Sequence, residues 1–156
     1  MKLSYNLGAF FYFHLKTLKF KFAMSDSCKT FSLLITSPPW SSQAHITALN
    51  FAKSIINKNH TLYRIFFYSD ATHVGINSAV APQDEKDLPS EWKELAKEHN
   101  IDLVVCISAG IKRGVLDANE QSRYETPANT LREGYELSGL GQLVDAIIKS
   151  DRVISF

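Results

Sequence analysis

The sequence is poor in cysteine and lacks the residue spacings that build metal sites. Its 156 residues include only two cysteines, Cys28 and Cys106, far apart and outside any Cys-x-x-Cys or Cys/His zinc pattern. We therefore expect no metal and no other cofactor. Two thiols in an otherwise ordinary chain indicate a reduced, cytoplasmic protein. The length suffices for one domain whose hydrophobic core needs neither disulfides nor a metal.

Acidic residues are missing from the first 23 residues, which contain four lysines and 7 of the 18 aromatic residues. The apolar stretch 7–13 is too short to span a bilayer, and no small-residue cleavage site follows it. Three interpretations remain open: a weak targeting peptide, an amphipathic surface or partner-binding segment, or a start codon assigned too early, with Met24 as the true start. We favour the third. Residues 1–29 are expected to be an N-terminal extension, disordered or the product of that misassigned start, and residues 30–156 to be the domain.

The chain also lacks an excess of positive charge. Its formal net charge is +1, and without the first 23 residues 13 basic residues stand against 16 acidic ones, a net −3. A domain of this charge binds a phosphate backbone poorly, so we expect no direct contact with nucleic acid. Since no apolar run is long enough to cross a bilayer, we expect no membrane association either.

From residue 30 onward, β-rich apolar runs alternate with helical patterns. We expect buried strands at 31–36, 62–68, 102–107 and 152–156, and helices from Ser41 or Ser42 to Ile55, at 89–100 and near 139–150. Polar stretches at 69–87 and 117–132 are expected to be loops. This alternation predicts an α/β fold: a single-domain three-layer sandwich with a mostly parallel sheet covered on both faces. The helix near 139–150 is expected to pack on the sheet.

The segment "DLVVCISAGIKRG" (102–114) places Cys106 where an apolar run ends and a basic turn begins. In parallel sheets, chemistry gathers beyond the carboxyl ends of the strands. A cysteine at such a place is either a small buried hydrophobe or a nucleophile. For the second interpretation, "SAG" would open a helix whose free N–H groups face the sulfur, and Lys112 or Arg113 would add positive charge. Both interpretations remain open on these residues alone.

Magnitudes limit what the helix can do. Half ionisation of a thiol at pH 7 requires a shift of roughly 1.5 pH units from its reference pKa, about 2 kcal/mol, whereas a helix terminus contributes about 0.3–1 kcal/mol. A direct N–H···S bond or a nearby cation must therefore supply the rest. Among the histidines, only His73 is expected at the same edge of the sheet, and no Ser/His/Asp order or pair of carboxylates stands out.

Two other kinds of site fit poorly. Cysteine phosphatases have arginine as the sixth residue after the cysteine, but here that residue is Lys112 and Arg113 comes one place late. The segment "TSPPWSSQA" (36–44) has the strand-to-helix position of a nucleotide site, yet it lacks glycine and its prolines remove N–H donors. We expect it to form a rim or a partner surface.

The residues around the cysteine, "VVCISAGIKRGVLD" (104–117), and the last segment, "YELSGLGQLVDAIIKSDRVISF" (135–156), resemble the DsrE/TusD family of sulfur-relay proteins. The segment "LLITSPPWSSQAHITALNFAKSII" (33–56) fits the same pattern. The resemblance covers residues 30–156. It implies a DsrE-like fold and a sulfurtransferase in which Cys106 is the catalytic residue, a transient persulfide carrier; it gives Cys28 and residues 1–23 no role.

The resemblance also implies partners and a pathway. The family member would accept sulfane sulfur from a TusA-like donor and pass it to a TusE-like acceptor, for 2-thiolation of tRNA wobble uridine. It would work with TusB- and TusC-like subunits in a heterohexamer with two copies of each. Alternatives are a DsrE-like subunit in dissimilatory sulfur oxidation, or a non-catalytic assembly subunit in which Cys106 belongs only to the core.

Overall fold

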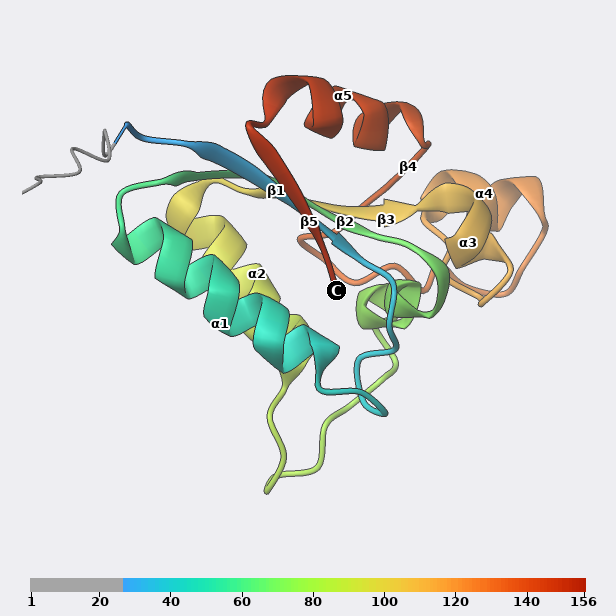
Figure 1. The fold of residues 1–156 in the computed structure, drawn as a ribbon. Helices are drawn as coiled ribbons and strands as arrows, with labels where there is room; N and C mark the ends of the chain where they lie inside the picture. The colour runs from blue at the N-terminus through green and yellow to red at the C-terminus, as the bar shows by residue number, and fades with distance from the viewer. Residues whose placement is uncertain (1–26) are drawn as a thin grey trace, which may run out of the picture.

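The computed structural model describes residues 27–156 (Figure 1). The predicted extension 1–29 lies almost wholly outside these residues. In chain order, the elements are β1 (Thr30–Ile35), α1 (Ala44–Asn57), β2 (Thr61–Phe67), the 3-10 helix η1 (Ser69–Gly75), α2 (Leu88–His99), β3 (Asp102–Cys106), α3 (Ile107–Ile111), α4 (Ala118–Arg123), β4 (Glu136–Ser138), α5 (Gly141–Lys149) and β5 (Arg152–Ser155).

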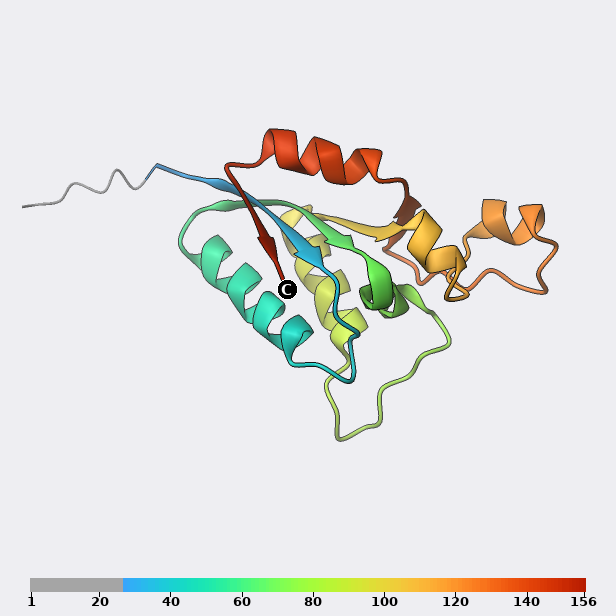
Figure 2. The same cartoon turned by 45° about the vertical axis from the view of Figure 1, so that its right-hand side comes forward.

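The five strands form one sheet in the order β4-β3-β2-β1-β5, and every strand pair is parallel. Figures 1 and 2 show α1, α2 and η1 beneath the sheet and α5 above it. The predicted α/β three-layer sandwich with a mostly parallel sheet is thus confirmed. Because all strands run the same way, the carboxyl ends of β1, β2 and β3 lie at one edge of the sheet, where the loops carrying candidate residues begin.

The two faces of the sheet are unequally covered. Beneath the sheet, a large core contains the fully buried Phe67 and Trp92 together with apolar residues of α1 and α2. Above it, a small cluster of buried residues holds Phe66, Val104, Cys106 and Ala109, with the partly buried Leu34 and Leu143 packed against it. Consecutive residues of a strand point to opposite faces, so Phe66 and Phe67 separate into the two layers.

Helix α2 begins and ends as its sequence predicts. The Asp87 side chain accepts a hydrogen bond from the backbone N–H of Ser90, Pro89 stands in the first turn, and Asn100 takes a left-handed conformation with φ 53° at the C-terminal end. Helix α1 departs slightly from expectation. Its N-cap is Gln43, without a side-chain cap bond, while the Ser42 hydroxyl accepts a hydrogen bond from the N–H of Ala44 at 3.1 Å.

Helix α5 attaches to the sheet largely through polar groups. The Asp145 carboxylate accepts hydrogen bonds from the Tyr63 hydroxyl at 2.7 Å and from the Arg64 guanidinium at 2.8 Å, and Arg64 also donates to the carbonyl of Gln142 at 2.8 Å. Arg64 is almost fully buried, and Asp102 binds it at 2.9 Å on the other side. The expectation that the apolar residues of this helix pack on the sheet holds only for Ala146 and Leu143; the others face outward.

None of the helices in residues 27–156 is long and apolar enough to cross a membrane. Three short elements fall in regions expected to be loops or were not predicted: η1 and α4 lie within the polar stretches, and β4 has only three residues.

Candidate functional site

Cys106 is the last residue of β3 and the N-cap of α3. Its strand pairs with β2 on one side and β4 on the other, so the residue lies in the interior of the sheet at the carboxyl edge. The predicted position at a strand end followed by a helix is therefore correct. Helix α3 is only five residues long, because the chain turns at Gly114 in a left-handed conformation with φ 77°.

The surroundings of the sulfur differ from the expectation of an accessible thiol with N–H donors. Cys106 is 0% exposed, and its side chain makes no capping hydrogen bond to α3. Its neighbours are apolar: Phe66, Val104 and Ala109, with Leu34 and Leu143 beside them. The reason is tertiary. Leu143 of α5 packs against the buried cluster that contains Cys106, and the sequence of β3 alone does not predict this contact.

A cavity of about 260 Å³ lies next to the residues that follow the cysteine, although Cys106 itself does not line it. Residues from the end of β2, from α3 and from the start of α5 line it: Tyr68, Ser69, Ser108, Ala109, Lys112, Arg113 and Leu140. Ala109 also belongs to the buried cluster around Cys106, so one small side chain contacts both the cavity and the cluster that contains the sulfur. Ser69 has a left-handed backbone with φ 54°, an unfavourable conformation for a residue other than glycine, at the turn where β2 ends.

The two cations expected near the sulfur have different roles. The Arg113 guanidinium donates to the Asp70 carboxylate at 2.8 Å and to the carbonyl of Ala109 at 3.1 Å, which ties α3 to η1. Arg113 is thus engaged in holding the turn. Lys112 is exposed at the cavity, and none of the ion pairs within residues 27–156 involves it.

Within residues 27–156, neither His73 nor His45 lines the cavity next to Cys106. His73 lies in η1 near the predicted edge, but its Nδ1 is within hydrogen-bond distance, 2.9 Å, of the carbonyl of Asp70. His45 is buried beneath the sheet. Its Nε2–H donates to the carbonyl of Ser37 at 2.9 Å, and its Nδ1 accepts a hydrogen bond from the Trp92 indole at 3.3 Å. Burial lowers the pKa of His45 to about 4, so the ring is neutral near pH 7 and fixes the loop after β1.

Glu120 is buried although it belongs to the polar stretch 117–132, which the sequence predicts to be a loop. This residue is 7% exposed in α4, where the Asp117 carboxylate accepts a hydrogen bond from its N–H. The signal was present as Asp117 followed three residues later by Glu120, a pattern of helix starts. Cys28 is exposed before β1, and no group of three or more potential metal ligands occurs within residues 27–156.

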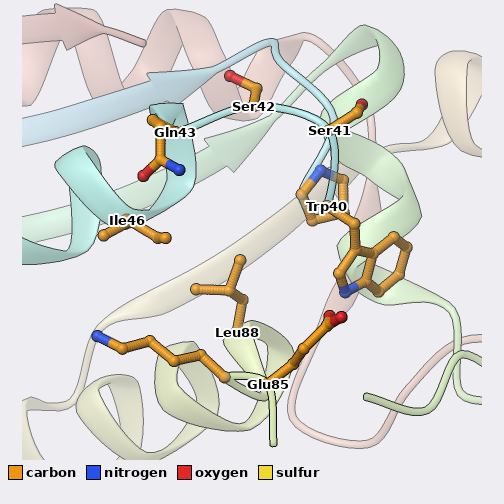
Figure 3. A pocket seen from close by; sticks show the side chains of 9 residues that line it. Trp40, Ser41, Ser42, Gln43, Ile46, Glu85 and Leu88 are labelled. Atoms are coloured by element: carbon orange, nitrogen blue, oxygen red, sulfur yellow. The ribbon is translucent and has the colours of Figure 1, made fainter. Parts of the chain in front are cut away.

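The "TSPPWSSQA" segment forms one wall of a larger open cavity, about 420 Å³ (Figure 3). Trp40, Ile46 and Leu88 come from three segments: the loop after β1, the first turn of α1 and the start of α2. Trp40 is 45% exposed. The cavity lies below the carboxyl edge and does not share a lining residue with the cavity next to Cys106.

Comparison with known proteins identifies the family of this chain and its class of chemistry. The profile of the DsrE/DsrF-like family matches residues 29–156. The chain belongs to this family. The sulfurtransferase TusD homolog of Pseudomonas aeruginosa is 42% identical over 126 residues, which cover 81% of this chain and 95% of the relative. The sulfurtransferase TusD of Photorhabdus laumondii is 38% identical over 83% of this chain and 99% of the relative.

Two further similarities define what the family assignment covers. The DsrE protein of Allochromatium vinosum is 38% identical over 81% of this chain and 97% of the relative, a similarity close to that of the TusD proteins. The crystal structure of the ychN protein from E. coli superimposes with a TM-score of 0.65 at 19% identity, over 82% of this chain and 99% of that chain, and shows the same fold. The curated relatives place this member of the DsrE/DsrF-like family among the sulfurtransferases.

Proposed function

We propose that this DsrE/DsrF-like protein is a cytoplasmic sulfur-relay subunit in which Cys106 carries sulfane sulfur as a transient persulfide. The observation that carries the proposal is the position of Cys106: within residues 27–156 it is the one cysteine at the carboxyl edge of the parallel sheet, beside a cavity. The sulfurtransferase names of the relatives supply the chemical class. Cys28 is exposed before β1, at the amino edge of the sheet, where it lines a cavity with Lys58, Asn59 and His60; it therefore lacks the position at the carboxyl edge.

The transfer requires two displacements and no outside oxidant. The Cys106 thiolate attacks the outer sulfur of a donor persulfide, the S–S bond of the donor breaks, and the donor cysteine leaves as a thiolate. An acceptor thiolate then attacks the outer sulfur on Cys106, which leaves as a thiolate in turn. Each step conserves one S–S bond, so the reaction needs one thiol and no acid–base pair.

The buried sulfur means that the site must open during transfer. Ala109 and Leu143 pack in the cluster around Cys106, and Ala109 also lines the cavity together with Leu140, Ser108 and Tyr68. Closure between transfers would protect a persulfide from reductants in bulk solvent. We propose that a TusA-like donor and a TusE-like acceptor reach the sulfur through this cavity, within a heterohexamer formed with TusB- and TusC-like subunits, and that the sulfur is destined for tRNA wobble uridine.

The decisive experiment follows ³⁵S from a persulfidated TusA-like donor onto the chain, alone and assembled with its TusB- and TusC-like relatives. We expect label on the wild-type protein, none on Cys106→Ser, and full labelling of the matched control Cys28→Ser. Label that remains on Cys106→Ser would refute the carrier role. Genomic neighbours and tRNA thiolation in a deletion strain distinguish the tRNA pathway from the alternative role in dissimilatory sulfur oxidation.

A second candidate function is favoured by one observation, the complete burial of Cys106 among apolar side chains. In a non-catalytic assembly subunit this cysteine would only fill the core. Alkylation of Cys106 in the Cys28→Ser variant separates the two functions. A carrier should label through local opening, at a rate almost independent of dilute denaturant, whereas a core cysteine should label only as fast as the whole domain unfolds.

A further inference from the structure

Helix α5 is attached to the sheet mainly by hydrogen bonds. Of its nine residues only Ala146 is buried, Leu143 is partly buried, and Val144, Ile147 and Ile148 are each more than half exposed. Burial of so little apolar surface contributes little free energy. The helix lies alone above the sheet in Figures 1 and 2. Its attachment therefore depends on the polar groups beneath it.

The two ends of α5 are held differently. After the C-terminal end, the Ser150 hydroxyl lies 2.8 Å from that of Ser32, and the chain continues directly into β5. Before the N-terminal end, Gly139 and Gly141 are so loosely packed that a Cβ atom on either would have nothing within 4 Å. The N-terminal end is therefore the freer of the two, and it carries Leu143.

Leu143 connects the freer end of α5 with the cysteine. It packs against the buried cluster that contains Cys106, and Leu140, the N-cap of α5, lines the cavity next to the residues that follow the cysteine. Residues three apart are neighbours on a helix, so these two side chains move together. Movement of the first turn of α5 away from the sheet would therefore open the cluster and widen the cavity at once.

Arg64 supplies the hydrogen bonds that hold this first turn. Its guanidinium, with a side chain only 7% exposed, has different partners on its two sides. Nη2 and Nε donate to the Asp102 carboxylate at 2.9 and 3.3 Å, within the sheet. Nη1 donates to the Gln142 carbonyl and to the Asp145 carboxylate, both in α5 and both at 2.8 Å. Asp102 therefore neutralises the guanidinium whatever the position of α5, whereas the Nη1 bonds exist only while α5 lies on the sheet.

We propose that Arg64 is a positioning residue for sulfur transfer: its Nη1 holds the first turn of α5 on the sheet and so keeps Leu143 packed around Cys106 until transfer. This inference rests on the carrier role proposed above. Arg64 does not touch the reacting sulfur, because it pairs with Asp102 at the other end of β3, roughly 13 Å from Cys106 at 3.3 Å per residue. Its release from α5 leaves no unpaired buried charge, so opening can be reversible.

Alkylation of Cys106 by iodoacetamide, without denaturant, tests this role in the full chain with Cys28→Ser. Arg64→Met removes both Nη1 bonds and keeps an apolar side chain in the buried position, so the rate should rise about tenfold or more. Arg64→Lys should restore part of the protection, because an ammonium cannot bind Asp102 and α5 together. Asp145→Ala removes one Nη1 bond from the partly exposed helix side and should give an intermediate rate. Wild-type rates in both Arg64→Met and Asp145→Ala would overturn the proposal.

Two matched variants separate positioning from a general loss of stability. Lys149→Met removes the bond to the Tyr63 hydroxyl, 3.1 Å long, at the opposite end of α5, and should keep the wild-type alkylation rate. Asp87→Ala removes the cap of α2 beneath the sheet and should also keep that rate in the absence of denaturant, although it lowers global stability. Equal acceleration in Arg64→Met and Lys149→Met would overturn the specific role of Arg64.

A persulfide loaded with ³⁵S shows whether the same residue acts in transfer. Glutathione thiolate attacks the outer sulfur, and Cys106 leaves as a thiolate. The half-life of the label in glutathione should be shorter in Arg64→Met than in wild type, by about the factor found for alkylation. Faster alkylation with an unchanged half-life would overturn the role in transfer. Absence of label from the wild type would instead refute the carrier function and leave the alkylation result to decide what Arg64 positions.

Discussion

The buried imidazole of His45 makes the stability of this protein sensitive to mild acid. In the folded state its Nε2–H and Nδ1 are both used, by the Ser37 carbonyl and the Trp92 indole, and burial lowers its pKa from 6.5 to about 4. The unfolded chain therefore binds a proton more readily than the folded chain between these two values. Stability contributed by the neutral ring is fully present above pH 6.5 and is lost as the pH falls toward 4.

The size of the effect follows from this difference. A shift of about 2.5 pH units corresponds to roughly 3 kcal/mol when the loss is complete, and about 2 kcal/mol should be lost between pH 7 and pH 5. Since small domains are stable by about 5–15 kcal/mol, a single imidazole would account for a considerable part of the acid sensitivity.

Urea unfolding curves at pH 7, 6, 5 and 4.5 measure this dependence, with tryptophan fluorescence as the signal. His45→Gln removes the titrating group while leaving an amide that can still bond the Ser37 carbonyl, so it should flatten the pH dependence even if it is less stable at pH 7. The matched control is His73→Gln in η1, which should keep the wild-type slope. Equal slopes for His45→Gln and wild type would refute the reasoning.

Three further substitutions test the packing of α3, the cap of α2 and the tie between η1 and α3. Gly110→Ala should destabilise the domain by about 1–3 kcal/mol in urea unfolding, because a Cβ there would lie 3.1 Å from Leu137 Cδ1 and within 3.4 Å of two valines under α3. Asp87→Ala should cost about 1 kcal/mol by removing the cap of α2, measured in the same way; no change would mean that the cap bond is absent in solution. Asp70→Asn should weaken the contact to Arg113 and speed alkylation of Cys106, while global stability changes by less than about 1 kcal/mol because the ion pair is partly exposed. An unchanged alkylation rate in that variant would show that the tie between η1 and α3 does not control opening.

The sequence predicts the fold well where its signal is local. The runs that became β1, β2 and β3 are apolar and β-rich, and α2 has its capping aspartate, its early proline and its terminal asparagine in order. Short helices and strands contain too few residues to show a hydrophobic periodicity from which they could be predicted. Strand β4 contributes one buried residue, Leu137, and η1 and α4 each consist of about two turns inside polar stretches.

The candidate site was predicted in position but not in environment. That Cys106 ends a central strand follows from its place after "DLVV", but its cover depends on where α5 lies, which is a tertiary property. The orientation of α5 depends in turn on Arg64, an isolated charge in the apolar run "LYRIFFY" that binds Asp102 and Asp145 from elements far along the chain. Its presence in a buried strand was the available signal that the helix above would present polar groups to it.

The pairing of β1 with β5 has a consequence for how the protein is made. The backbone N–H of Thr36 donates to the carbonyl of Phe156, 120 positions later in the chain, and β1 has β5 as its outer neighbour. At about 5–20 residues per second, the ribosome needs roughly ten seconds to deliver that neighbour after β1 has been translated. During that interval the edge of β1 is open to other nascent chains, so chaperones should engage this protein late in its synthesis.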